Sequence, residues 1–230
     1  MGGYGTFVEI GADITQICCM FEGMAFKKSI KRFDFGGSDI TSHLSRLLYE
    51  RGYYFKSNSE LKIVDQIKEK ICYVPLDYEK ESEQFQKSSS LNQNYILPDG
   101  EVITLGNELI RSTECFFDQK LIGNESGSIQ EWIFNSIFSS DMDSIKDLCT
   151  INLSGGSTLC KGFTERLEKE LIGLFPTNFK VRLRSAIDRK YKVWVGGSIF
   201  TEYTRLPYWI TKKEFEENGF SYQQRFNYFF

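Results

Sequence analysis

Paired glycines at predicted strand-to-helix junctions constrain the fold of this chain more than any other feature. The tripeptide Gly-Gly-Ser occurs three times, at 36–38, 155–157 and 196–198, each time between a run typical of a strand and a run with helical spacing. Glycine permits positive φ and close backbone approach, and a free helix amino terminus suits phosphate or a nucleotide. Each junction is therefore a candidate nucleotide loop, with tight helix–strand packing as the alternative.

Strands that alternate with helices predict a mixed α/β fold. The strands are expected at 6–10, 14–21, 32–35, 95–103 (two runs around a Pro-Asp-Gly turn), 150–153, 179–183 and 191–195. The helices are expected from 40 to a stop at 52, at 57–71, 128–137, 141–148 and 163–174, from 196 to a break at Pro207, and after Thr211. Residues 79–94 are polar, which indicates a helix end followed by a solvated loop.

Charge and hydropathy argue against several classes of partner. The net charge of the 230 residues is −3 and no basic stripe stands out, so we expect no nucleic-acid partner. The apolar runs are too short for a bilayer and no signal-like segment is visible at the start, which predicts a cytoplasmic protein without a membrane partner. The six cysteines lack zinc-site spacing and His43 is the single histidine, so we expect reduced thiols and no metal ligands.

Aromatic residues are abundant, at 15% of the chain. Two interpretations stay open: an aromatic-rich core, or a surface reserved for a partner, where aromatic side chains are enriched. The apolar tail at 226–230 favours the second interpretation.

Several specific motifs resemble the second half of actins, in the family's order and spacing. The most specific are Leu-Ser-Gly-Gly-Ser-Thr at 153–158, which is similar to the adenosine loop of actins, Val-Trp-Val-Gly-Gly-Ser at 193–198, and Ile-Lys-Glu-Lys-Ile-Cys-Tyr-Val at 67–74. Leu-Pro-Asp-Gly at 97–100, Phe-Asn-Ser-Ile at 134–137 and Arg-Lys-Tyr at 189–191 are similar too. The resemblance covers essentially the whole chain.

This resemblance implies an α/β, actin-like (ribonuclease-H-like) fold that corresponds to actin subdomains 3 and 4 plus the carboxy-terminal part of subdomain 1. Residues 1–36 and 125–191 would form subdomain 3, residues 37–124 the inserted subdomain 4, and residues 192–230 the helical segment of subdomain 1. The first phosphate loop of the family is then expected to lie outside this sequence.

On the adenosine side, the matching residues agree well with the family. The resemblance implies that this part of the pocket is formed by Gly37, Lys68, Glu69, Gly155, Gly156, Ser157 and Lys190. Glu69 could accept hydrogen bonds from ribose hydroxyls, and the stems of Lys68 and Lys190 could cover the base. The alternative for Lys68 and Glu69 is a solvated helix face. Asp65 departs from the family, which usually has arginine there.

On the phosphate side, the match is poor. The family hairpin Asp-Ser-Gly-Asp-Gly is replaced by Glu9-Ile10-Gly11-Ala12-Asp13, and Gln16 stands where the family has a histidine. Phosphoryl transfer depends on carboxylates that hold Mg²⁺ beside the phosphates. We therefore expect no catalytic residues and no ATP hydrolysis by this chain alone. We also expect no cofactor, with ATP or ADP and Mg²⁺ as the alternative.

These features predict a non-catalytic structural or scaffold subunit of a larger intracellular assembly, in the cytoskeleton or a cilium. The expected partners are other protein subunits, including actin or actin-related chains. One alternative is an adenine-nucleotide-binding half-actin whose phosphate site is completed by another chain. Another is a subunit of a nuclear chromatin-remodelling complex. A filament-forming actin is disfavoured by Asn124, which stands where actins carry a hydrophobic plug.

Overall fold

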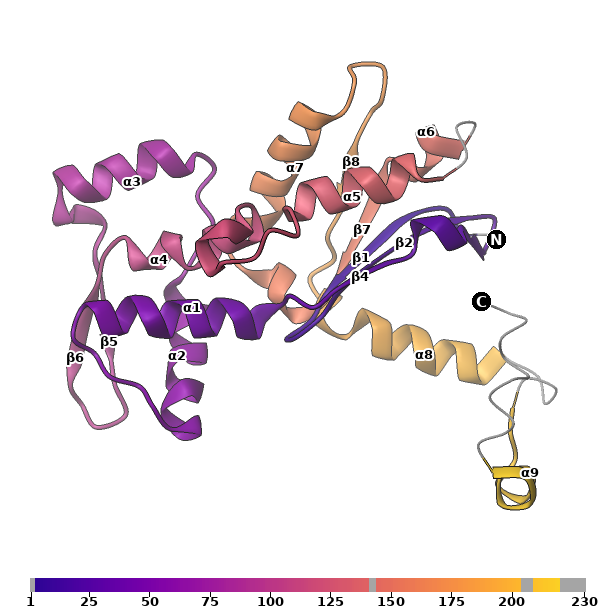
Figure 1. The fold of residues 1–230 in the computed structure, drawn as a ribbon, viewed down its shortest axis with the longest axis horizontal. Coiled ribbons are helices and arrows are strands. Elements are labelled where there is room, and N and C mark those ends of the chain that lie inside the picture. Colours follow the sequence, from indigo (N-terminus) through magenta and orange to yellow (C-terminus); the bar gives the residue numbers. More distant parts are fainter. Residues whose placement is uncertain (1–2, 141–143, 204–208, 220–230) are drawn as a thin grey trace.

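The computed structural model describes residues 3–140, 144–203 and 209–219 (Figure 1). The strands are β1 (Gly5–Ile10), β2 (Thr15–Phe21), β3 (Met24–Ala25), β4 (Lys31–Phe33), β5 (Gln93–Ile96), β6 (Val102–Leu105), β7 (Thr150–Ser154) and β8 (Arg182–Arg184). The α-helices are α1 (Gly37–Glu50), α2 (Asn58–Ile71), α3 (Tyr78–Lys87), α4 (Glu108–Arg111), α5 (Ile129–Phe138), α6 (Ile145–Leu148), α7 (Phe163–Leu174), α8 (Lys192–Tyr203) and α9 (Lys212–Asn218). None of the helices described is long and apolar enough to span a membrane.

A mixed sheet forms the centre of the larger body. Its strand order is β3-β2-β1-β7-β8, with β4 also paired to β2. Strand β1 is antiparallel to β2 and parallel to β7, so Val8 lies between Ile17 and Leu153. The α/β prediction is therefore confirmed.

Among the described residues, the hydrophobic core buries one face of this sheet. Side chains alternate along a strand, and in β1 the residues Thr6, Val8 and Ile10 are fully buried while Phe7 is exposed. The buried face packs with α5, α6 and α7, whose core residues include Ile133, Leu148 and Leu167. Ring contacts such as Phe116 with Phe163, 4.8 Å between centroids, fill this core. Many of the aromatic residues are thus core residues, as the first interpretation predicted.

A second hydrophobic core lies in the segment between β4 and α5. It gathers residues of α1, α2, α4 and the β5–β6 hairpin, including Leu44, Val64 and Ile103. Figure 1 shows these elements together at the opposite end of the molecule from β2 and α6. The separate core agrees with an inserted unit, although the subdomain boundaries themselves stay a prediction.

Most local predictions are confirmed by the structure. The β1–β2 and β5–β6 hairpins form, and Ser57 and Glu60 bond reciprocally at the start of α2. The same capping pattern opens α9 at Thr211 and Glu214. All six cysteines are free, and burial raises the pKa of Cys72 and Cys160 to about 12.

Three predictions near the helices need correction. The strand expected at 191–195 is wrong, because the chain forms a 3₁₀ turn (Arg189–Tyr191) and then α8. The third Gly-Gly-Ser therefore lies inside α8 and not at a strand-to-helix junction. Valine and tryptophan there suggested a strand, but β propensity depends on a sheet neighbour, and this segment pairs with none of the described strands.

The polar segment at 79–94 also differs from its prediction. It contains a complete helix, α3, because Asp77 caps its first turn by accepting from the Lys80 amide. Predictions that involve Asp141, Pro207 and the tail at 226–230 lie outside the described residues.

The single histidine of the chain is buried on α1. The side chain of His43 is next to Arg46, whose Nη2 donates to His43 Nδ1 over 2.8 Å and to the Leu121 carbonyl over 2.9 Å. Burial, then the charges of Arg46 and Arg111, lower the pKa of His43 to about 4. His43 is therefore neutral in the folded chain at physiological pH.

We predict that this buried imidazole makes the fold sensitive to mild acid. An unfolded histidine titrates near pH 6.5, so the unfolded state takes up a proton before the native state does. Stability contributed by neutral His43 is complete above about pH 6.5 and is lost as pH falls towards 4, by on the order of 3 kcal/mol.

The ring-proton NMR titration should give one histidine signal with a pKa near 4. A His43→Gln variant should lose this part of the pH dependence in urea unfolding, and a native pKa near 6.5 contradicts the account.

Candidate functional site

Two segments, the start of α1 and the loop after β7, converge on the backbone of the β1–β2 turn. The Gly37 amide donates to the Gly11 carbonyl over 3.0 Å, and the Ser157 hydroxyl donates to the same oxygen over 2.7 Å. The Ser38 amide donates to the Ala12 carbonyl over 2.7 Å. The first amides of α1 are thus bonded within the chain, so the packing alternative describes the junction at 36–38.

Glycine is required at two of these contacts. A Cβ on Gly36 would lie 2.4 Å from the Ala12 carbonyl oxygen, and a Cβ on Gly155 would lie 2.2 Å from the Ile10 carbonyl oxygen. Gly155 also has φ +91, a conformation that side chains rarely adopt. The glycine pairs let the β7 loop and α1 approach the β1–β2 turn directly.

Most residues predicted for the adenosine side lie together at this junction. A Cβ on Gly37 would be 2.6 Å from Ser157 Oγ and 3.3 Å from Lys68 Nζ. The stem of Lys190 runs along Gly156, 3.7 Å from the position of its missing Cβ. Gly155 completes the group because its amide donates to the carbonyl of Arg189. The space beside these glycines is taken by the side chains of Ser157, Lys68 and Lys190 of this chain.

Lys68 and Glu69 differ in their surroundings. The Lys68 side chain is only 15% exposed and bonds to Gly37 O, Thr41 Oγ1 and Asp65 Oδ1. Glu69 is exposed, and within the described part of the chain its carboxylate has no hydrogen bond or ion pair. Glu69 therefore lies on a solvated helix face, as the alternative expected, whereas Lys68 does not.

The degenerate phosphate-side residues lie on the open face and turn of the sheet. Glu9 is the cross-strand neighbour of Gln16 and lies beside Ser154. Ala12 and Asp13 are exposed in the turn. This donor set does not fit the Mg²⁺ site of the family, because Glu9 is its one carboxylate on the sheet. Among the residues described, no group of three His, Cys, Asp or Glu side chains could hold a metal ion.

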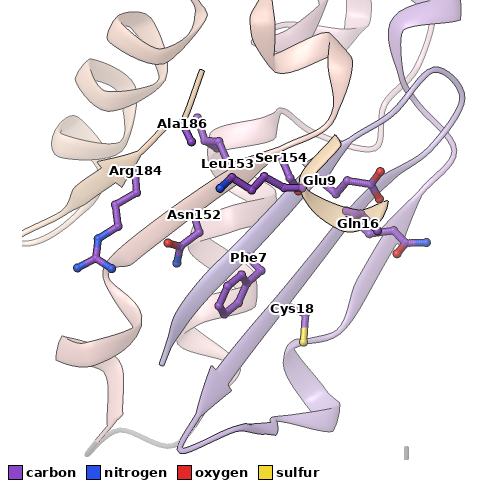
Figure 2. Close-up of a pocket in the computed structure, with 11 residues that line it drawn as sticks. Phe7, Glu9, Gln16, Cys18, Asn152, Leu153, Ser154, Arg184 and Ala186 are labelled. Carbon is purple, nitrogen blue, oxygen red and sulfur yellow. The ribbon is translucent and has the colours of Figure 1, made fainter. Parts of the chain in front are cut away.

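A cavity of about 530 Å³ lies over this open face. Figure 2 shows Phe7, Cys18, Asn152 and Arg184 projecting from the same side of the sheet as Glu9 and Gln16. The full lining comprises Phe7, Glu9, Gln16, Cys18, Asn152, Leu153, Ser154, Arg184, Ala186, Lys192 and Val193. Because Lys192 and Val193 open α8, the cavity connects the sheet to that helix.

This cavity was not predicted from the sequence. Its floor could have been found from the period of two in β1, β2 and β7, where Phe7, Cys18 and Asn152 alternate with core residues. The wall of the cavity at Lys192 and Val193 could not have been found in this way, because those residues were predicted to form a strand.

The sequence model of the actin family matches residues 3–226 of the 230 residues. The chain therefore belongs to the actin family. The match agrees with the mixed sheet and the glycine loops described above, and the correspondence to the second half of an actin stays a prediction.

We predict opposite effects of alanine at two glycines. Gly155→Ala should destabilise the fold by about 3 kcal/mol, because it combines an unfavourable φ with a clash against the Ile10 backbone. Gly173→Ala is the matched control on α7, where an added Cβ meets nothing within 4 Å. This control should stabilise by about 0.5 kcal/mol through helix propensity. Urea unfolding of both variants measures the difference, and equal stabilities contradict the tight junction.

Proposed function

We propose that this chain is a non-catalytic structural subunit of a larger intracellular assembly, cytoskeletal or ciliary, and that it docks through α8. The observation that carries the proposal is the exposure of this apolar helix. None of the 12 residues of α8 is buried. Val193 is 58% exposed, Trp194 76% and Ile199 54%.

The composition of α8 favours a partner in contact with it. A helix that is apolar on all sides is normally buried, and large exposed apolar patches mark interaction sites. Gly196 and Gly197 lie in its interior, where each glycine costs about 1 kcal/mol relative to alanine. A short helix of this kind gains its stability from packing, which a protein partner would supply. Figure 1 shows α8 extending away from the sheet, on the side opposite α5.

The chemistry of α8 also defines the class of partner. Its apolar side chains suit a protein surface, and the partners we propose are protein subunits, including actin or actin-related chains. The cavity of about 530 Å³ beside Val193 extends the same surface onto the open face of the sheet. A partner side chain that enters this cavity would contact Phe7 and Asn152.

We further propose that the chain does not hydrolyse ATP by itself. The turn residues Ala12 and Asp13 replace a carboxylate and a glycine of the family hairpin. The amides of Gly11, Gly37 and Ser38, which could otherwise donate to a phosphate, donate to carbonyl oxygens of this chain.

A second candidate function is an adenine-nucleotide-binding module whose phosphate site is completed by another chain. The observation in its favour is the convergence of Gly37, Lys68, Gly156 and Lys190. Both candidates use the same fold and differ in whether this pocket is occupied in the working assembly.

We predict that Trp194→Ala separates the chain from its assembly. Truncation of a central interface tryptophan typically costs at least about 2 kcal/mol, or roughly 30-fold in affinity. Size-exclusion chromatography with light scattering, on tagged chain recovered natively from its source, should show the wild type in a complex and the variant largely free.

Ile96→Ala is the matched control, since Ile96 on β5 is 68% exposed. This control variant should stay in the complex. The unfolding midpoint of Trp194→Ala should equal that of the wild type. A variant that stays fully in the complex, or a wild type found free, rules out docking through α8.

A further inference from the structure

On the side of the site predicted for adenosine, the side chains of Thr41, Asp65 and Lys68 are hydrogen-bonded to one another. We propose that Asp65 determines whether this pocket accepts a nucleotide, by holding the Lys68 ammonium against α1. This inference does not depend on the proposed docking function, because it concerns a different surface of the chain.

Every donor of Lys68 is used by this chain. Its Nζ lies 2.9 Å from Gly37 O, 2.8 Å from Thr41 Oγ1 and 2.6 Å from Asp65 Oδ1. An ammonium has three N–H donors and no acceptor. A ligand that uses Lys68 must therefore displace one of these three partners.

Asp65 is the strongest of the three partners. It lies one turn before Lys68 on α2, and its carboxylate also contacts the Thr41 hydroxyl at 2.8 Å. Hydrogen bonds between two charged groups are shorter and stronger than neutral ones. The surroundings are partly dry, since the Lys68 side chain is 15% exposed and that of Asp65 48%. Thr41, Asp65 and Lys68 thus form a closed triangle between α1 and α2.

The charge state of Asp65 supports this contact. Burial alone would raise the pKa of Asp65, but hydrogen bonds from Lys68 and Thr41 and the charge of Lys68 outweigh it and lower the pKa below its usual value. The charge of Lys190 also lowers the pKa of Asp65. The carboxylate is therefore ionised at neutral pH and attracts both lysines that are expected to cover the base.

The position of the triangle explains its effect on a ligand. Lys68 Nζ lies 3.3 Å from the missing Cβ of Gly37, at the point where α1 meets Ser157. An ammonium fixed here takes up the space beside Gly37 that a ligand would need. A residue without a negative charge at position 65 would release it.

The test compares wild type with Asp65→Ala in the full chain. Asp65 lies on the surface of α2, where alanine is a good helix former, so the variant should fold. Glu83→Ala is the matched control, because it removes an exposed acid–lysine pair with Lys87 on α3, far from the pocket. Binding of MgATP is measured by calorimetry. Acetylation of Lys68 by an amine-reactive ester is followed by peptide mass spectrometry.

We expect Asp65→Ala to bind MgATP at least about tenfold more tightly than the wild type, since one charge-assisted hydrogen bond no longer competes. Lys68 should also be acetylated several-fold faster in this variant, and Glu83→Ala should change neither quantity. The proposal is overturned if both proteins bind MgATP with equal affinity, or if neither binds it. It is also overturned if the rate of Lys68 acetylation is the same in both proteins. None of these results affects the Trp194 experiment, so failure here is distinguishable from failure of the docking proposal.

Discussion

The carbonyl oxygen of Gly11 is the acceptor on which the arrangement of the site depends. It receives the first amide of α1 and the hydroxyl of Ser157, and so joins the β1–β2 turn to both glycine loops. The backbone of the two loops packs directly on the backbone of the turn. A Cβ on Gly36 or Gly155 would clash there with a carbonyl group. The sheet, α1 and the β7 loop are thus held together by the same few backbone atoms.

The two sides predicted for the site differ in their contacts. On the phosphate side Glu9 and Gln16 face each other on an open sheet, and the turn is bonded to the chain itself. On the side predicted for adenosine most of the predicted residues lie together, and Lys68 donates a hydrogen bond to Asp65. The apolar helix α8 is the part of the chain that most needs a neighbour. A chain that retains the family fold, binds its own loops and exposes such a helix is suited to a structural role.

Local signals predicted much of this structure, and long-range contacts explain where they failed. The strands at 6–10 and 14–21, the two runs around the Pro-Asp-Gly turn, and the glycine junctions at 36–38 and 155–157 depend on neighbouring residues, so they were predicted well. Residues 191–195 were assigned to a strand because valine and tryptophan favour a sheet, but no described strand pairs with them and the segment is helical. The cavity over Phe7 and Asn152 could not be predicted, since it depends on α8 starting beside the sheet. The Asp65–Lys68 pair follows from its i,i+3 spacing on α2, whereas the contacts of both side chains with Thr41 depend on the crossing of α1 and α2, which no spacing reveals.

The central claim is that this chain works as a docked actin-family subunit without a nucleotide of its own. Native mass spectrometry of the complex purified from its source tests it most directly, because one spectrum reports both partner mass and bound nucleotide. The account predicts a stable multi-subunit mass that contains this chain and no ATP or ADP on it. A free single chain, or a complex with one nucleotide for each copy of this chain, would contradict the claim.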